Sequence, residues 1–402
     1  MLKTRPNAKP QTVSVHAKET VQTQIKHCNI INENTMFEIT IKEIKEAYNR
    51  LKTHVYYDTS DLFIRRRIAE FETNLSSSID IFSVNKEYIK NNNIFSSEFG
   101  LTKTLDEKFE KIAESINNDI SFFDAFLNKM EIRYLPKHFE SDKLPSNFIS
   151  NKRIKGTYNI ERASAFIDIP VELHLITVLW IMKYGKHYDS SLSEHAYGNR
   201  LLLNQEKDDL IIGSGLFKPY YKQYQKWRDS AVNSAKSTLE IGEDVMFLNL
   251  DIKDYYYSVK LNIDEITNGK EKSHNYYSNL LSIFKSIHIR FTNELKKVNF
   301  PFNYENKLEE NNVVLPIGLL SSYILGNYYL KDFDNTVIKK LKPHYYGRYV
   351  DDILFVIKNP NCIDDVNEKS QHDLIVSELG QILKKENIEN KSNDPCTESK
   401  TL

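Results

Sequence analysis

The sequence has few cysteines, no long apolar run and almost no net charge. It contains three cysteines in 402 residues. None of them lies in a C-x-x-C spacing, so neither a zinc cluster nor a disulfide framework is indicated. The longest apolar stretch, residues 171–182, includes Glu172 and His174 and is too short to span a bilayer. The polar N-terminus lacks the apolar segment of a signal peptide. We therefore expect a cytoplasmic protein that makes no contact with a membrane.

The balance of charges limits how this chain could bind nucleic acid. Lysine and arginine together number 54, and aspartate and glutamate number 55, which excludes a wholly basic surface and leaves only local patches. One such patch places a lysine at every fourth position among aromatic residues. Its members are Lys218, Tyr220, Tyr221, Lys222, Tyr224, Lys226 and Trp227. On a helix, the lysines could neutralise phosphates while the rings stack on bases. The alternative is an exposed lysine face over a buried aromatic face.

Hydrophobic periodicity predicts a chain that begins with helices and then mixes helices with strands. A Thr-x-x-Glu capping box at residues 40–43 opens the first predicted helix, and an apolar stripe predicts another over residues 106–130. Residues 154–169 have a strand-like pattern, and Pro170 suits the first position of a helix that ends at Gly185. We therefore expect an α/β chain whose N-terminal third is mostly helical.

Acidic residues stand at the ends of predicted strands. An apolar strand over residues 246–250 stops at Asp251, and the segment 345–357 is strand-like on both sides of Asp351 and Asp352. This second segment predicts a hairpin with the two aspartates at its tip. If the strands are neighbours in one sheet, Asp251 and Asp351 meet at the same edge. The alternative for the tip is a solvated Asx-type turn without a chemical role.

Carboxylates that meet at one sheet edge repel one another unless a counter-charge is present. Mg²⁺, with Mn²⁺ as a substitute, supplies that charge through oxygen ligands. Two such ions, about 3.5–4 Å apart, can hold both the attacking and the leaving oxygen of a phosphoryl transfer. Asp251, Asp351 and Asp352 are therefore candidate catalytic and metal-binding residues for an in-line transfer.

Three motifs give the sequence a resemblance to a known family. DIKDYYYS begins at Asp251, LPIGLLSS at Leu315 and YVDD at Tyr349. In this order they resemble the palm motifs of reverse transcriptases. They are most similar to the bacterial branch that contains retron, group II intron and defence-associated or abortive-infection enzymes. The resemblance implies an α/β right-hand polymerase with a fingers–palm core and an antiparallel palm sheet. An α-helical region would precede this core, and the thumb would be absent or incomplete.

The resemblance implies metal-binding and nucleotide-selecting positions. Asp251, Asp351 and Asp352 match the metal-binding carboxylates, and Ile252 would offer its backbone carbonyl to the metal. Tyr256 matches the steric gate, an aromatic ring that clashes with a ribose 2′-hydroxyl and so selects deoxynucleotides. The alternative for Tyr256 is a plain core aromatic.

Further positions are implied to bind substrate. Pro316 and Gly318 match the turn before the palm helix, where a missing Cβ lets the backbone approach the template or the incoming base. Tyr349 matches the residue that touches the primer end. The position of the family's triphosphate-binding arginine holds an alanine here, so Arg162 and Arg200 are the two candidates. For Arg162 the alternative is a surface salt bridge.

We expect five segments, which are a flexible arm (1–35), a helical region (36–150), a fingers-like region (151–245), a palm (246–358) and a partial C-terminal segment (359–402). The implied activity is RNA-directed DNA polymerase in antiphage defence, with an RNA template, a DNA or protein primer and deoxynucleotides as partners. A second reverse transcriptase-like subunit or a non-coding RNA could complete the enzyme. The alternatives are template-independent DNA synthesis, another palm enzyme such as a nucleotidyl cyclase, and a non-catalytic scaffold that binds nucleic acid.

Overall fold

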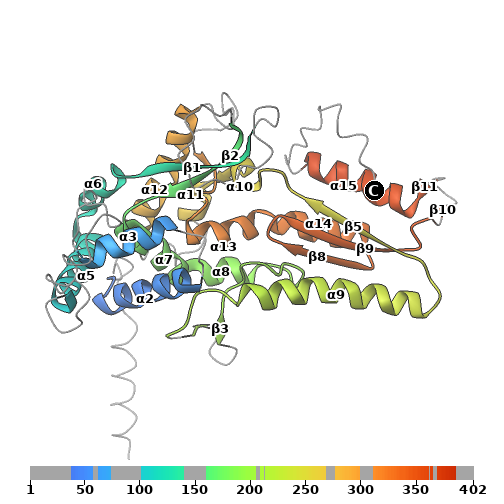
Figure 1. The fold of residues 1–402 in the computed structure, drawn as a ribbon, viewed down its shortest axis with the longest axis horizontal. Coiled ribbons are helices and arrows are strands. Elements are labelled where there is room, and N and C mark those ends of the chain that lie inside the picture. The colour runs from blue at the N-terminus through green and yellow to red at the C-terminus, as the bar shows by residue number, and fades with distance from the viewer. Residues whose placement is uncertain are drawn as a thin grey trace, which may run out of the picture.

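The computed structural model describes residues 38–57, 62–73, 101–139, 160–204, 209–211, 213–268, 277–298, 311–361, 363–364 and 369–385. The expected flexible arm, residues 1–35, lies outside these ranges. The described part mixes helices with antiparallel strands, and its N-terminal helices lie at the opposite end from a three-stranded sheet (Figure 1). None of the described helices is long and apolar enough to cross a membrane.

The N-terminal part is helical, as the periodicity predicts. Its elements are α2 (Ile41–Tyr57), α3 (Leu62–Thr73), α5 (Leu101–Asn118), the 3₁₀ turn η1 (Ile120–Phe123) and α6 (Asp124–Leu127). The capping box before α2 is confirmed, because the backbone N–H of Thr40 donates to the Glu43 carboxylate and that of Glu43 to the Thr40 hydroxyl. The single helix predicted over residues 106–130 is wrong. Asp119 accepts a hydrogen bond from the N–H of Ser121 and thereby starts η1 instead of continuing α5.

An antiparallel hairpin follows, and its first strand was not predicted. The strands are β1 (Glu131–Phe139) and β2 (Ile160–Asp168), paired from Glu131 with Asp168 onward. β1 lies in the region expected to be helical, so the pairing crosses the expected boundary at residue 150. The sequence pattern does not indicate this strand, because Pro136 and the charged residues around it are unusual within a strand.

A buried helix follows β2. Pro170 is the N-cap of α7 (Val171–Trp180) rather than its first residue, and the helix does not end at Gly185. It continues through a π-helical turn, η3 (Ile181–Gly185), into α8 (Lys186–Ser190). The Trp180 ring stacks on Phe284 with 4.6 Å between ring centroids, which places α7 in the core against α12 (Ser278–Lys297).

Short elements connect the core to the sheet. They are β3 (Leu203–Asn204), β4 (Asp209–Leu210), α10 (Tyr255–Ser258), β6 (Leu261–Asn262), α11 (Ile263–Thr267) and β7 (Asn312–Val313). The C-terminal elements are β10 (Ile363–Asp364), β11 (Lys369–Ser370) and α15 (Gln371–Lys385).

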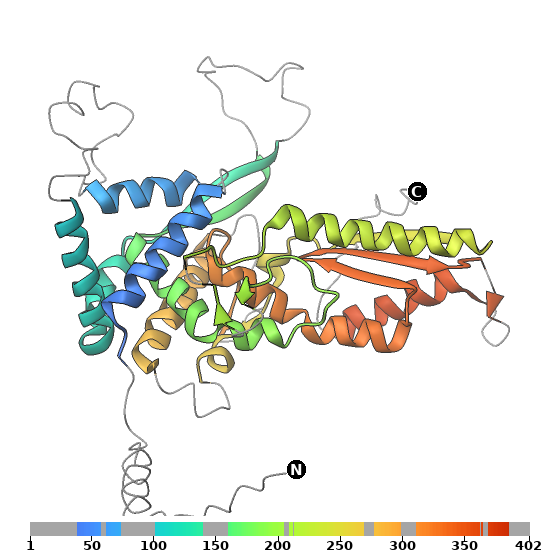
Figure 2. The same ribbon diagram turned by 90° about the horizontal axis from the view of Figure 1, so that it is seen from below.

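The three-stranded sheet has the order β5–β9–β8 and is antiparallel throughout. Its strands are β5 (Val245–Asp251), β8 (Tyr345–Tyr349) and β9 (Asp352–Lys358). The helices that flank it are α9 (Tyr220–Glu240), α13 (Leu320–Tyr329) and α14 (Lys331–Leu341). Figure 2 shows the sheet between α9 on one face and α14 on the other. The sheet thus has a helix on each face, and β9, its central strand, has the most buried residues of the three strands.

Candidate active site

Three aspartates come together at one end of this sheet. Asp251, the last residue of β5, pairs directly with Asp352, the first residue of β9. The backbone N–H of Ile252 donates to the carbonyl of Asp351 at 3.2 Å, which holds the turn residue beside the end of β5. The prediction that these strands are neighbours is confirmed, and the three aspartates lie at the same edge.

The turn between β8 and β9 is backbone-strained. It consists of Val350 and Asp351, so only one of the two aspartates expected at the tip is in the turn, and Asp352 belongs to the strand. Val350 has a φ of 60°, which is an uncommon conformation for a β-branched residue and costs on the order of 1–3 kcal/mol. Such a conformation persists only when the surrounding contacts fix it.

The electrostatics of the turn reflect crowded carboxylates. Burial raises the pKa of Asp351 to about 6, and the charges of Asp251 and Asp352 act in the same direction. Burial, followed by the charge of Asp251, also raises the pKa of Asp352. The charge of Lys137, on β1, acts against the shift at Asp351. The site therefore disfavours its own ionised state, as expected where a positively charged group is to bind.

The donor set suits a hard divalent cation. Carboxylate oxygens are the ligands that Mg²⁺ prefers, and after burial the charges of Asp251 and Asp352 also raise the pKa of Asp351. Within the described ranges, no three His, Cys, Asp or Glu side chains are already arranged as a metal-binding group. The aspartates fit the ion by chemistry and by backbone position, and metal binding by them and by the Ile252 carbonyl stays a prediction.

A buried ion pair between Arg348 and Asp334 contacts the backbone of the turn. Arg348 donates from Nε and Nη2 to the two carboxylate oxygens of Asp334, at 2.8 and 2.7 Å. Its Nη1 donates to Asn327 Oδ1 at 3.0 Å and to the Val350 carbonyl at 2.7 Å. Both charged side chains are completely buried. Burial lowers the pKa of Arg348, but Asp334, Tyr346 and Tyr255 together raise it, so the net shift is upward and the guanidinium stays charged. The pair thus joins α14 and β8 to the strained residue of the turn.

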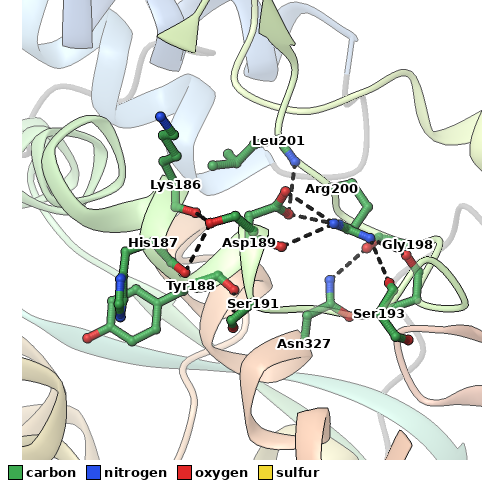
Figure 3. Close-up of polar contacts among 12 residues, drawn as sticks. Lys186, His187, Tyr188, Asp189, Ser191, Ser193, Gly198, Arg200, Leu201 and Asn327 are labelled. Atoms are coloured by element: carbon green, nitrogen blue, oxygen red, sulfur yellow. Dashed lines mark hydrogen bonds and ion pairs between the residues drawn. The ribbon is translucent and has the colours of Figure 1, made fainter. Parts of the chain in front are cut away.

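The loop over residues 195–200 holds the other side of the hairpin. The N–H of Arg348 donates to the carbonyl of His195, and the N–H of Tyr197 donates to the carbonyl of Arg348, both at 2.8 Å. Asn327 Nδ2 donates to the Gly198 carbonyl at 2.6 Å (Figure 3). A Cβ on Gly198 would lie 2.8 Å from Val350 Cγ2 and 3.0 Å from its backbone nitrogen, so a side chain there has no room. This close approach helps to fix the conformation of Val350.

The part of the chain that contains this sheet is similar to a known protein family. Residues 213–393 match the family model described as reverse transcriptase (RNA-dependent DNA polymerase). This segment is similar to reverse transcriptases. No curated protein matches the chain. The reverse transcriptase-like segment contains the whole β5–β9–β8 sheet and the three aspartates, whereas Arg162, Arg200 and the β1–β2 hairpin precede it.

Tyr256, the expected steric gate, lies close to the aspartates. It is half-buried, with its ring centroid 5.6 Å from that of Tyr255. Burial, followed by Tyr323, Tyr255 and Asp351, raises its pKa well above the ordinary value, so its hydroxyl is neutral. Tyr256 therefore packs partly as a core aromatic, and it lies near enough to Asp351 for the carboxylate charge to raise its pKa. Its role as a gate stays a prediction.

The LPIGLLSS motif forms backbone hydrogen bonds with Tyr256 and with β2. The N–H of Leu315 donates to the Tyr256 carbonyl at 3.0 Å, and the N–H of Ile167 on β2 donates to the Ile317 carbonyl at 3.0 Å. Pro316 is buried, and Gly318 has a φ of 95°, which favours glycine. The motif thus connects the β1–β2 hairpin with the segment that follows Asp251. Substrate binding by Pro316 and Gly318 stays a prediction.

The two candidate arginines have different surroundings. Arg200 donates to Asp189 from Nε at 3.0 Å and from Nη1 to the carbonyls of Ser193 and Ala196 (Figure 3). These contacts are structural and hold the loop. Arg162, on β2, instead forms an ion pair with Asp254, only three residues after Asp251. This is the salt bridge given as its alternative, but it lies next to the aspartates. Triphosphate binding by either arginine stays a prediction.

Sequence reasoning missed Lys137. This exposed residue of β1 is the positive charge that partly offsets the upward shift in the pKa of Asp351. It lies at the irregularity in the β1–β2 register, between the residues that pair with Ala163 and Arg162. No local pattern marks it, because a lone lysine in a polar segment is most often solvated. Only the pairing of β1 with β2 brings it to the site.

Proposed function

We propose that this protein is an RNA-directed DNA polymerase that adds deoxynucleotides to a primer 3′-hydroxyl. One observation carries the proposal: Asp251 pairs with Asp352 and lies beside Asp351 in a segment that is similar to reverse transcriptases. We further propose that it acts in the cytoplasm in antiphage defence. That part rests on the resemblance of its motifs to the bacterial defence-associated branch.

The three aspartates are the metal-binding and catalytic residues of this proposal. Two bound Mg²⁺ ions would supply activation of the attacking hydroxyl and neutralisation of the charge that develops on the transferred phosphate. Asp251 and Asp351 would hold them, with the Ile252 carbonyl as a further oxygen ligand, and Asp352 would add negative charge beside Asp251. The charges of Asp251 and Asp352 add to burial in raising the pKa of Asp351, and a bound cation would relieve this repulsion.

Residues around the aspartates bind the substrates. Tyr256 places its ring where it rejects a 2′-hydroxyl, and Tyr349 contacts the primer end. Lys137 and Arg162, neighbours on the β1–β2 hairpin, face the triphosphate and match its negative charge. Gly318 lets the backbone approach the template or the incoming base. An RNA template, a DNA or protein primer and deoxynucleotides are the implied partners, and a second subunit or a non-coding RNA could complete the enzyme.

Incorporation of labelled deoxynucleotides on a primed RNA template, with Mg²⁺ present, tests the proposal. Asp351→Asn keeps the shape of the side chain and removes its charge, so extension should fall by about two orders of magnitude or more. Asp332→Asn is the matched control, because Asp332 is an exposed acid on α14. Equal extension by the wild type and Asp351→Asn rejects the mechanism.

The remaining outcomes separate the alternatives. Extension that does not depend on the RNA template supports template-independent synthesis. Binding of primer–template without extension, by a folded wild-type protein with either Mg²⁺ or Mn²⁺, supports the non-catalytic scaffold.

A further inference from the structure

The first two turns of α9 carry aromatic and basic side chains that the chemistry of the aspartates does not use. We call them the α9 face, and its members are Tyr220, Tyr221, Lys222, Tyr224 and Lys226. The three tyrosines are 71%, 57% and 45% exposed, in this order, whereas Trp227 is buried. The alternative of a buried aromatic face below exposed lysines is therefore wrong for the tyrosines.

The tyrosines are exposed because α9 extends past the end of the sheet. Trp227 and Ala231 lie on the stripe of α9 that packs against the strands, and the Tyr345 hydroxyl of β8 donates to the Trp227 carbonyl at 2.8 Å. Tyr220 and Tyr224 continue the same stripe toward the N-terminus of the helix. Figure 2 shows the N-terminal end of α9 extending past the end of the sheet. Tyr220 and Tyr224 lie in this end of the helix, and both side chains are exposed.

Tyr349 connects the α9 face with the aspartates. Its ring centroid lies 5.4 Å from that of Tyr224 in an edge-on arrangement, and its hydroxyl donates to the Tyr220 carbonyl at 3.3 Å. On the other side, Tyr349 pairs with Asp352 across the hairpin. A molecule that stacks on the exposed rings therefore lies next to the proposed catalytic residues.

The lysines give the α9 face a positive charge. Lys222 and Lys226 form no ion pair with an acidic residue of the described ranges, and Lys226 Nζ lies 5.9 Å above the Tyr197 ring. Arg228 differs, because it forms an ion pair with Asp229 at 2.8 Å. The exposed rings and the uncompensated lysines lie on different sides of the same two helical turns. A strand that crosses this end of α9 can therefore present bases to the rings and phosphates to the lysines. The α9 face does not match a protein partner well, because lysine is depleted in protein–protein interfaces.

We infer that the α9 face binds single-stranded nucleic acid and leads it to the Asp351–Asp352 turn. Bases stack on the rings of Tyr220, Tyr221 and Tyr224, and phosphates pair with Lys222 and Lys226. The inference rests on the proposed function only where it names this strand as the template or the primer of a polymerase.

Binding of dye-labelled single-stranded RNA and DNA oligonucleotides, followed by fluorescence anisotropy, tests the inference. The Asp351→Asn background prevents extension during the measurement. Tyr220→Ala with Tyr224→Ala should weaken binding at least about thirtyfold, since the loss of each stacking contact weakens single-strand binding about fivefold or more. The corresponding Phe pair keeps the rings and should bind like the parent. Tyr56→Ala, at an exposed tyrosine on α2, is the matched control and should have no effect.

Salt dependence tests the lysines separately. Lys222→Ala with Lys226→Ala should reduce the slope of log affinity against log salt concentration by about 1.4, which corresponds to two lost phosphate contacts on a single strand. Lys236→Ala, on the distal half of α9, should leave the slope unchanged. Wild-type-like binding by the Tyr→Ala pair, or an unchanged slope for the lysine pair, overturns the inference. A change of oligomeric state in the Tyr→Ala pair, with unchanged oligonucleotide binding, would assign the face to a second copy of the chain and also overturn it.

The two proposals fail independently. Loss of oligonucleotide binding in the tyrosine variants of a protein that never extends a primer supports the α9 face and rejects the polymerase. Extension by the wild type together with unchanged binding by the variants supports the polymerase and rejects the α9 face.

Discussion

The buried ion pair of Arg348 and Asp334 allows a quantitative test of what holds the turn between β8 and β9. Arg348→Met removes the guanidinium and leaves the Asp334 carboxylate buried, with the Tyr346 hydroxyl, 2.5 Å away, as a remaining donor. Asp334→Asn removes the opposite charge and leaves the guanidinium with neutral acceptors. Each single change leaves one uncompensated charge in the core.

The expected magnitude follows from complete burial. Breaking a buried pair by removing one partner costs about 3–5 kcal/mol of unfolding free energy, because the remaining charge stays desolvated. The double variant Arg348→Met/Asp334→Asn has no buried charge, so it should be more stable than the sum of the single effects predicts. The coupling between the two sites should lie at about 1–3 kcal/mol. Arg66 and Glu70, a pair on α3 whose arginine is 48% exposed, should show a coupling of only about 0.3–0.5 kcal/mol.

Urea unfolding followed by tryptophan fluorescence measures these values. The chain has two tryptophans, and Trp227 lies against the β8 side of the sheet, where it reports on the region of the pair. Single-variant costs below about 1 kcal/mol, or additive effects in the double variant, would refute the reasoning. In primer extension, the single variants should lower kcat more than they change KM, because Arg348 acts on the turn through the Val350 carbonyl and does not contact substrate.

Three further predictions concern the charge of Asp351. Extension should decline as the pH falls through about 6, because burial and the neighbouring carboxylates raise the pKa of Asp351 to about 6 and the protonated acid is a poor ligand. The same raised pKa means that the metal-free protein should lose stability as the pH rises from about 4 to about 6, and Asp351→Asn should reduce this slope in urea unfolding. Lys137→Ala should raise the KM for deoxynucleotides about tenfold and move the acidic limb of the pH–rate profile to higher pH, since its charge lowers the pKa of Asp351. No change in either quantity would exclude Lys137 from the site.

The features that the sequence predicts well are those with a local cause. β5 and the β8–β9 hairpin are apolar runs that stop at acidic residues, and α9 repeats its lysines at helical spacing. The neighbouring positions of Asp251 and Asp351 followed from one assumption, that the strands share a sheet, and the register of β5 with β9 meets it.

The features that escape prediction depend on contacts between distant residues. Arginine is rarely buried, so nothing in the local sequence marks Arg348 as a core residue, and its partner Asp334 lies on another element. β1 becomes a strand through its pairing with β2, in spite of Pro136. Lys137 reaches the site only through that pairing. Side-chain exposure on α9 likewise depends on where the sheet ends, which helical periodicity does not reveal.

Several unfavourable features occur within a few residues of the turn. Val350 has a positive φ, Arg348 and Asp334 bury charge, and Asp351 is crowded by like charges. Each lowers stability or demands compensation, and a fold selected for stability alone would not gather them at one edge. The loop at Gly198 and the side chain of Asn327 hold this arrangement in place. A cation between the carboxylates would remove the repulsion and leave the strained turn in position. Concentrated strain at the aspartates is therefore what a preorganised metal-dependent site requires, and it argues against an inert hairpin turn.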